Sequence, residues 1–257
     1  MPILPVLSSG SRVLTGGGGD PSGGWTRLPP ILRRMLRFQN MDFELALWQM
    51  TYLCIAPRKV YKQVYYHKQT HNTWARNDPA MLLLISAALG LTSAAWSFVY
   101  QLGPLGGIRL ALVMVFRDFV LTGLIICSFL WFMSNRLLNQ TAPGTVQTDP
   151  GNVEWAYAFD VHCNGFVPVF LLLYVIQLIL VPVITQERWV CLLLGNLLYL
   201  VAFTQYFYIT YLGYNALPFL IRTEVILTPL IPILIGFVAS LLGYNVARRA
   251  LSLYFGT

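Results

Sequence analysis

Long stretches without a charged residue follow one another along the last two-thirds of the chain. About 20 predominantly apolar residues cross the hydrocarbon core of a bilayer, so stretches of this length predict membrane-spanning helices. The second stretch reaches that length only if it includes Arg109, Arg117 and Asp118. We expect five spans, near residues 81–102, 108–133, 165–185, 190–212 and 226–245.

The pattern therefore predicts an all-α fold, a polytopic membrane helical bundle of about five transmembrane helices. Membrane helices tolerate internal prolines because neighbouring groups bind the freed carbonyls, and the stretches contain Pro168, Pro182, Pro229 and Pro232. Five spans cannot divide into two equal halves, which argues against a transporter built from inverted repeats.

A shorter uncharged stretch, Leu45–Pro57, precedes the first span and cannot cross a bilayer. Asn40 or Asp42 is placed to cap a helix here, and Pro57 ends it. We expect this helix to lie in the membrane surface or to pack on the bundle. One face would carry Phe43, Leu47, Met50 and Cys54.

The chain divides into three expected segments. Residues 1–32 are rich in glycine and serine and form a disordered leader. Residues 33–79 form a basic, cytosolic, interfacial helical segment, and residues 80–257 form the five-helix transmembrane domain.

Composition supports a membrane protein and excludes a soluble one. Apolar residues make up 56% of the chain and charged residues only 11%, against roughly 25% charged in soluble domains. The four cysteines are scattered without a CxxC pair, so neither a disulfide framework nor a zinc module is expected. We expect no metal, no cofactor and no enzymatic activity.

The positive charge is concentrated ahead of the first span. Residues 1–79 hold ten Lys/Arg and four Asp/Glu, a net charge of +6, whereas the rest of the chain has a net charge of +1. Basic residues near a span favour the cytosolic side, so we expect a cytosolic N-terminus with loops 134–164 and 213–225 on the same side. Arg248 and Arg249 would then be luminal, against this rule.

Basic and aromatic residues alternate just before the first span, and the candidate docking residues among them are Arg58, Lys59, Lys62, Lys68, Trp74 and Arg76. They would set topology and anchor the segment at the interface. They also fit anionic lipid headgroups or an acidic protein surface. Single-stranded RNA is a weaker alternative, because no RNA-binding motif accompanies them.

Two ionisable residues, Arg117 and Asp118, fall near the middle of the second expected span. Each charge would cost roughly 2.5–3.5 kcal/mol at the bilayer centre, so they should face the bundle. Partners could come from Asn196, Gln177 or Gln205. A structural contact is favoured over an ion path.

A juxtamembrane polar cluster, Glu154, Asp160 and His162, stands just ahead of the third expected span. Two carboxylates and a histidine suit acid–base or metal chemistry. The competing interpretation is a partly amphipathic helix that enters the membrane at its surface, and we favour it because no second cluster completes a site.

Several stretches carry a family resemblance. RRMLRFQNMDFELALWQMTYLCIAPRKVYKQVYYHKQTHNTWARNDPA, WFMSN, VEWAYAFDVHCNGFVP and LGYNALPFL occur in this order and resemble the Unc-fifty (uncoordinated-type) family of Golgi multipass membrane proteins, over about residues 33–257. Asp118, Glu154, Asp160 and His162 match family positions, while Arg117 stands where an apolar residue is expected.

The resemblance implies a Golgi protein with five spans and a cytosolic N-terminus. It also implies a role in vesicular traffic: delivery of nicotinic-type receptors to the cell surface and association with an Arf guanine-nucleotide exchange factor. We therefore expect as partners anionic lipid headgroups, such an exchange factor and membrane cargo receptors. The alternatives are a transporter or channel that uses Asp118, a membrane enzyme centred on the juxtamembrane cluster, and an RNA-binding membrane protein.

The predicted topology makes a direct prediction for Asn139. The sequence Asn139-Gln140-Thr141 is a glycosylation acceptor, and a cytosolic loop 134–164 keeps it away from the luminal transferase. Digestion of the cell-derived protein with an N-glycosidase should therefore leave its mobility unchanged. A glycan on Asn139 would overturn this topology.

Overall fold

The computed structural model describes residues 42–62, 74, 79–139 and 151–255. The chain divides into two units, Met1–Phe38 and Gln39–Thr257, and all described residues belong to the second; the expected leader, residues 1–32, lies outside them. Five helices in the described part are long and apolar enough to cross a membrane. They are Ala80–Val99, Gly103–Leu138, Trp155–Ile184, Trp189–Asn215 and Thr223–Ser240.

The five expected spans are thus confirmed, with corrections to their ends. The first span is α4 (Ala80–Val99) and the fourth is α9 (Trp189–Asn215). The second combines α5 (Gly103–Leu112), the π-helical η3 (Val113–Leu121), α6 (Thr122–Met133) and η4 (Ser134–Leu138). The fifth combines η6 (Thr223–Leu227) and α10 (Leu230–Ser240), and ends before Gly243, whose φ of 127° is unfavourable for other residues.

The third span begins at Trp155, ten residues before the expected start, and combines α7 (Trp155–Val169), η5 (Phe170–Ile176) and α8 (Gln177–Ile184). The early part was misjudged because its polar side chains have partners on other helices. The Tyr157 hydroxyl donates to the Gly213 carbonyl at 2.6 Å, and Asn164 accepts from Gln49 at 2.7 Å. Such pairing removes most of the cost of burial.

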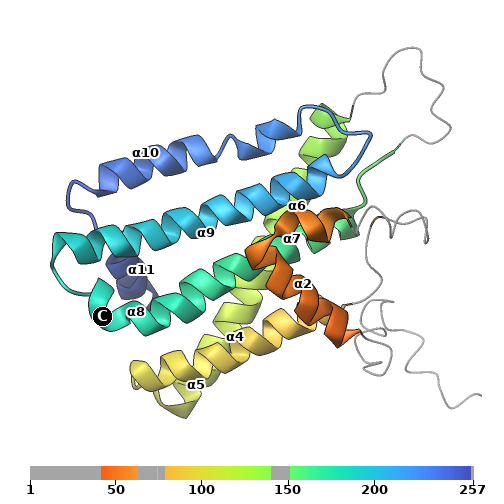
Figure 1. Cartoon of the computed structure of the whole chain (residues 1–257). Coiled ribbons are helices and arrows are strands. Elements are labelled where there is room, and N and C mark those ends of the chain that lie inside the picture. Colours follow the sequence, from red (N-terminus) through yellow and green to blue (C-terminus); the bar gives the residue numbers. More distant parts are fainter. Residues whose placement is uncertain (1–41, 63–73, 75–78, 140–150, 256–257) are drawn as a thin grey trace, which may run out of the picture. The chain divides into compact units, whose positions relative to one another are not determined.

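The helices α7 and α9 form the centre of the bundle and lie side by side (Figure 1). Small residues let them approach closely, as is common where membrane helices pack. A Cβ on Gly213 of α9 would lie 2.7 Å from Cγ2 of Val161 on α7. On the other side of α7, a Cβ on Gly123 of α6 would lie 2.6 Å from the His162 ring.

The helix α2 (Phe43–Ile55) corresponds to the expected interfacial helix and packs against α4 and α7. Asp42 caps it by accepting a hydrogen bond from the Leu45 amide. The buried residues of α2 are Ala46, Gln49 and Leu53, whereas Leu47, on the expected apolar face, is 54% exposed. The hydrogen bond between Gln49 and Asn164 requires this orientation, because it ties a polar residue of α2 to α7.

A further helix, α11 (Val246–Phe255), follows the fifth span and packs on α9; it had not been predicted. Two asparagines fix its start. Asn196 of α9 accepts from the Val246 amide and donates to the Ser240 hydroxyl and the Tyr244 carbonyl. Asn245 accepts from the Arg248 amide and donates to the Ile184 carbonyl, so α8, α9 and α11 are joined.

The substitution Gly213→Ala should destabilise the bundle, because the new methyl group would overlap a valine that has little room to move. We expect a loss of about 1–3 kcal/mol in the free energy of unfolding, measured by thermal unfolding of the purified protein in lipid nanodiscs. The matched control is Gly90→Ala in α4, where no atom lies within 4 Å of the new Cβ. Equal stabilities of the two variants would contradict the close packing of α7 and α9.

Candidate functional site

The basic segment before the first span is partly described. Lys68 and Arg76 lie outside the described residues, whereas Arg58, Lys59 and Lys62 are all exposed. The Arg58 guanidinium donates from Nε to the Tyr208 hydroxyl at 2.8 Å, which ties the segment to α9. The Lys59 ammonium lies 5.2 Å from the Tyr52 ring centroid, within the range of a cation–π contact.

Trp74, at the far end of this segment, is 8% exposed. Its ring meets the rings of Tyr157 and Phe219 edge-on, at 6.3 and 6.2 Å between centroids. Its backbone amide lies 3.4 Å from a Glu154 carboxylate oxygen that accepts from it. Trp74 therefore contacts protein, where we had expected an anchor at the headgroups, and it holds the segment against α7.

The two loops that were expected on one side meet at the end of the bundle where Trp74 lies. The Asn135 side chain pairs with the backbone of Val153 in both directions. Asn139 forms an isolated bridge with Leu220 and donates from its side chain to the Gly151 carbonyl. The loop after the second span is thus joined both to the start of α7 and to the segment after α9.

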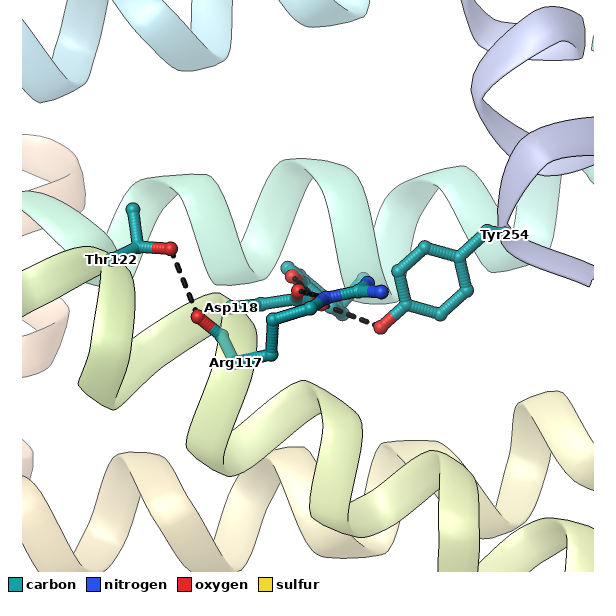
Figure 2. Close-up of polar contacts among 5 residues, drawn as sticks. Arg117, Asp118, Thr122 and Tyr254 are labelled. Atoms are coloured by element: carbon teal, nitrogen blue, oxygen red, sulfur yellow. Dashed lines mark hydrogen bonds and ion pairs between the residues drawn. The ribbon is translucent and has the colours of Figure 1, made fainter.

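A second group of polar residues lies inside the bundle. Arg117 Nε lies 2.7 Å from an Asp118 carboxylate oxygen, although the two residues are adjacent in sequence (Figure 2). The other Asp118 oxygen accepts from the hydroxyls of Tyr174 and Tyr254. The expected partners Asn196, Gln177 and Gln205 are not those the structure provides.

The two charged residues of this pair have different surroundings. The Asp118 side chain is 15% exposed and that of Arg117 is 56% exposed. Asp118 therefore faces the bundle as expected, whereas the expectation that Arg117 faces it as well was wrong, because this side chain pairs with Asp118 from the exposed side of the helix. The Arg117 guanidinium also lies 4.9 Å from the Tyr254 ring centroid. Burial and the nearby Asp118 carboxylate raise the pKa of the Tyr254 hydroxyl, which therefore remains a hydrogen-bond donor at neutral pH.

His162 is 2% exposed and bonded through both ring nitrogens. Its Nε2 lies 3.2 Å from the Phe119 carbonyl and its Nδ1 lies 2.8 Å from the Tyr206 hydroxyl. Because a carbonyl only accepts, Nε2 carries the proton and Nδ1 accepts from the tyrosine. Phe119 belongs to the π-helical η3, and widened turns of this kind often occur at functional sites.

Asp118 and His162 line the same cavity, which has a volume of about 540 Å³. Gln177 contributes a buried amide to the same wall, which also includes Thr122 and four tyrosines. Glu154 contacts Trp74 at the end of the bundle and does not line this cavity. The structure therefore divides the juxtamembrane polar cluster: His162 lines the cavity, whereas Glu154 lies at the end of the bundle. Asp160, the remaining residue of this cluster, is half-buried.

Tyr174, Tyr206 and Tyr254 could not be recognised from the sequence, because a tyrosine within an apolar run has no distinctive spacing. Gln177 was named only as a partner for the charged pair. Among the described residues, no three His, Cys, Asp or Glu side chains gather as metal ligands.

The pairing of Arg117 with Asp118 predicts that substitutions of the two residues have non-additive effects on the free energy of unfolding. Asp118→Leu leaves an unpaired guanidinium beside two tyrosines, whereas the double change to leucine removes both charges. We expect the double variant to be more stable than the sum of the single variants by about 1–3 kcal/mol. Thermal unfolding in nanodiscs measures this, and Arg109→Leu, an exposed arginine of the same span, controls for the loss of one charge. Additive effects would show that the pair is not coupled.

Comparison with known proteins yields a consistent set of relatives. The family model described as UNC-50 family matches residues 31–255. A rat protein named "Protein unc-50 homolog" is 44% identical over 225 residues, which cover 87% of this chain and 85% of the relative. A Dictyostelium discoideum protein of that name is 36% identical over 100% of this chain and 98% of the relative.

The Caenorhabditis elegans protein named "Protein unc-50" is 41% identical over 90% of this chain and 75% of the relative. No solved structure matches the chain significantly. The family match and the relatives cover the segment before the first span and all five spans. The chain is therefore a multi-pass membrane protein that belongs to the UNC-50 family.

Proposed function

We propose that this protein is a non-catalytic Golgi membrane protein that acts in vesicular traffic. Its N-terminal segment, on the cytosolic face, binds an Arf guanine-nucleotide exchange factor and anionic lipid headgroups. Its cargo includes receptors of the nicotinic acetylcholine type, which it helps to deliver to the cell surface. The Golgi location, the exchange factor and the cargo follow from the family resemblance.

The observation that carries the proposal is the way the basic residues are presented. Arg58, Lys59 and Lys62 are exposed, whereas Val60 and Tyr61 between them are 2% and 5% exposed. Val60 and Tyr61 pack against the bundle and hold the backbone in place. The three cations are therefore presented on a rigid segment. A pre-organised charged surface loses less entropy on binding than a free tail.

The neighbouring loops support the same proposal because they widen the surface. A shallow pocket is lined by Arg58, Lys62, Tyr211 and Asn215, among others. This pocket is at the end of α9 where the loops after the second and fourth spans meet. A cytosolic partner with an acidic face would thus meet cations and hydrogen-bonding groups together.

A transporter or channel that uses Asp118 is supported less well. Both Asp118 carboxylate oxygens are engaged, one by Arg117 and the other by two tyrosines. A passing cation would have to displace these donors. Reconstituted vesicles should therefore show no ion flux that depends on Asp118.

The docking proposal predicts a loss of partner when the cations are neutralised. In mildly solubilised Golgi membranes, changing Arg58, Lys59 and Lys62 to glutamine should reduce recovery of the exchange factor roughly tenfold, equivalent to about 1.4 kcal/mol. A quantitative pull-down measures this, and neutralising Lys68 and Arg76 as well should reduce it further.

The matched control neutralises three arginines at the other end of the bundle, Arg188, Arg248 and Arg249, which are all exposed. This control should recover the exchange factor as the wild type does. If the correctly inserted docking variant retained its partner, the basic segment would serve only as a topological and lipid anchor.

A further inference from the structure

The cavity inside the bundle has a size and position suited to a ligand from the bilayer. Its volume of about 540 Å³ falls within the roughly 300–1,000 Å³ of small-molecule sites. Phe203 and Phe207 of α9 and Ile233 of α10 contribute to its wall. These residues belong to membrane-spanning helices, so the molecules surrounding the site are lipids.

Gln177 is the residue that points to an occupant. Its side chain lines the cavity, and the residue is 2% exposed. The amide nitrogen makes no hydrogen bond of normal geometry among the described residues, although the Tyr199 hydroxyl, on the same wall, interacts with this side chain. An unsatisfied buried donor costs about 1–3 kcal/mol, and a ligand that offers an acceptor would remove this cost.

The charges around the cavity disfavour an ionic ligand. Among the described residues, the wall contains the Asp118 carboxylate and no lysine or arginine, so a phosphate group would find no cation on the wall. A cationic ligand would have to compete with Arg117, which is paired with Asp118. The remaining class is a neutral molecule with a large apolar body.

The helix α11 closes one side of this cavity. Leu251, Tyr254 and Phe255 all line it. Phe255 stacks on Tyr100 with centroids 4.0 Å apart and an interplanar angle of 9°. The contact between Tyr254 and Asp118 adds a hydrogen bond across the cavity wall, visible in Figure 2. The aromatic wall supplies a flat, apolar surface for a rigid or extended hydrocarbon body.

We propose that this cavity binds a neutral membrane lipid whose polar head carries one hydroxyl group and no charge, and that the lipid hydroxyl accepts a hydrogen bond from the Gln177 amide. Sterols have this chemistry, and diacylglycerols share it with two uncharged ester groups in addition. The site is independent of the docking surface, since it is built from the spans and α11. The proposal therefore stands or fails separately from the proposed role in traffic.

Photocrosslinking of the full-length protein in nanodiscs tests the proposal. One arm uses a photoreactive sterol and the other a photoreactive diacylglycerol, each competed by its unlabelled lipid and, separately, by phosphatidylserine. One of the two neutral probes should label the cavity wall saturably, the matching lipid should compete, and phosphatidylserine should not. The probe that labels the cavity wall identifies which of the two lipids is the ligand.

Two variants locate the site. Gln177→Leu should weaken saturable labelling about tenfold, the effect of one lost hydrogen bond to a buried donor. Ala250→Phe, on the α11 side of the cavity, should abolish labelling by filling the space. The matched control is Gln186→Leu, which changes an exposed glutamine at the end of the same span and should label as the wild type does.

Thermal unfolding of each variant checks that the bundle is intact. Gln177→Leu removes a hydrogen-bond donor, whereas Ala250→Phe fills the cavity. If one of the two variants fails to fold, the other still tests the site. Unsaturable labelling spread over the lipid-facing surface would overturn the proposal. So would labelling by a neutral probe that neither cavity variant changes, or competition by phosphatidylserine as strong as that by the neutral lipids.

Discussion

A polar group inside hydrocarbon has no water to bind, so it must find its hydrogen-bond partners on other helices of the same protein. The arrangement of this bundle follows from that requirement. Gln49 on α2 meets Asn164 on α7, His162 on α7 meets the Phe119 carbonyl and Tyr206, and Asn196 on α9 meets the start of α11. Each bond joins elements that are far apart in sequence, and apolar packing alone would leave their rotation about the helix axis weakly specified.

The same requirement shapes two regions of the protein, the basic segment at the end of the bundle and the cavity within the bundle. At the end of the bundle, polar pairs hold the basic segment and two loops together, and three cations of this segment are exposed to a partner. Within the bundle, Asp118 and His162 have hydrogen-bond partners on other helices, whereas the Gln177 amide nitrogen is one of four buried polar atoms without one in the described part of the chain. The end of the bundle thus presents positive charges on a rigid backbone, whereas the apolar cavity contains an amide donor without a hydrogen-bond partner.

The number and approximate position of the spans were predictable from sequence because about 20 apolar residues suffice to identify each one. The early start at Trp155 was not predictable, since Tyr157, His162 and Asn164 read as surface residues until their partners on α2 and α9 are known. The face of α2 that packs on the bundle was not predicted either, because it is set by a polar pair: the hydrogen bond from Gln49 to Asn164 turns Gln49 toward α7 and leaves Leu47 exposed. Of the candidate site, the sequence identified Asp118 and His162, whereas the tyrosines that bind them became evident only from the packing.

The Asp118 cluster also has a consequence for biosynthesis. Its tyrosine partners come 56 and 136 residues later in the chain, so the second span leaves the ribosome long before either is available. Until then the adjacent Arg117 is the partner within the same span that can pair with the carboxylate, and it remains paired in the complete fold. The second span can therefore enter the membrane with its own counter-ion, but it reaches its final set of hydrogen bonds only after the last helix of the bundle has been made.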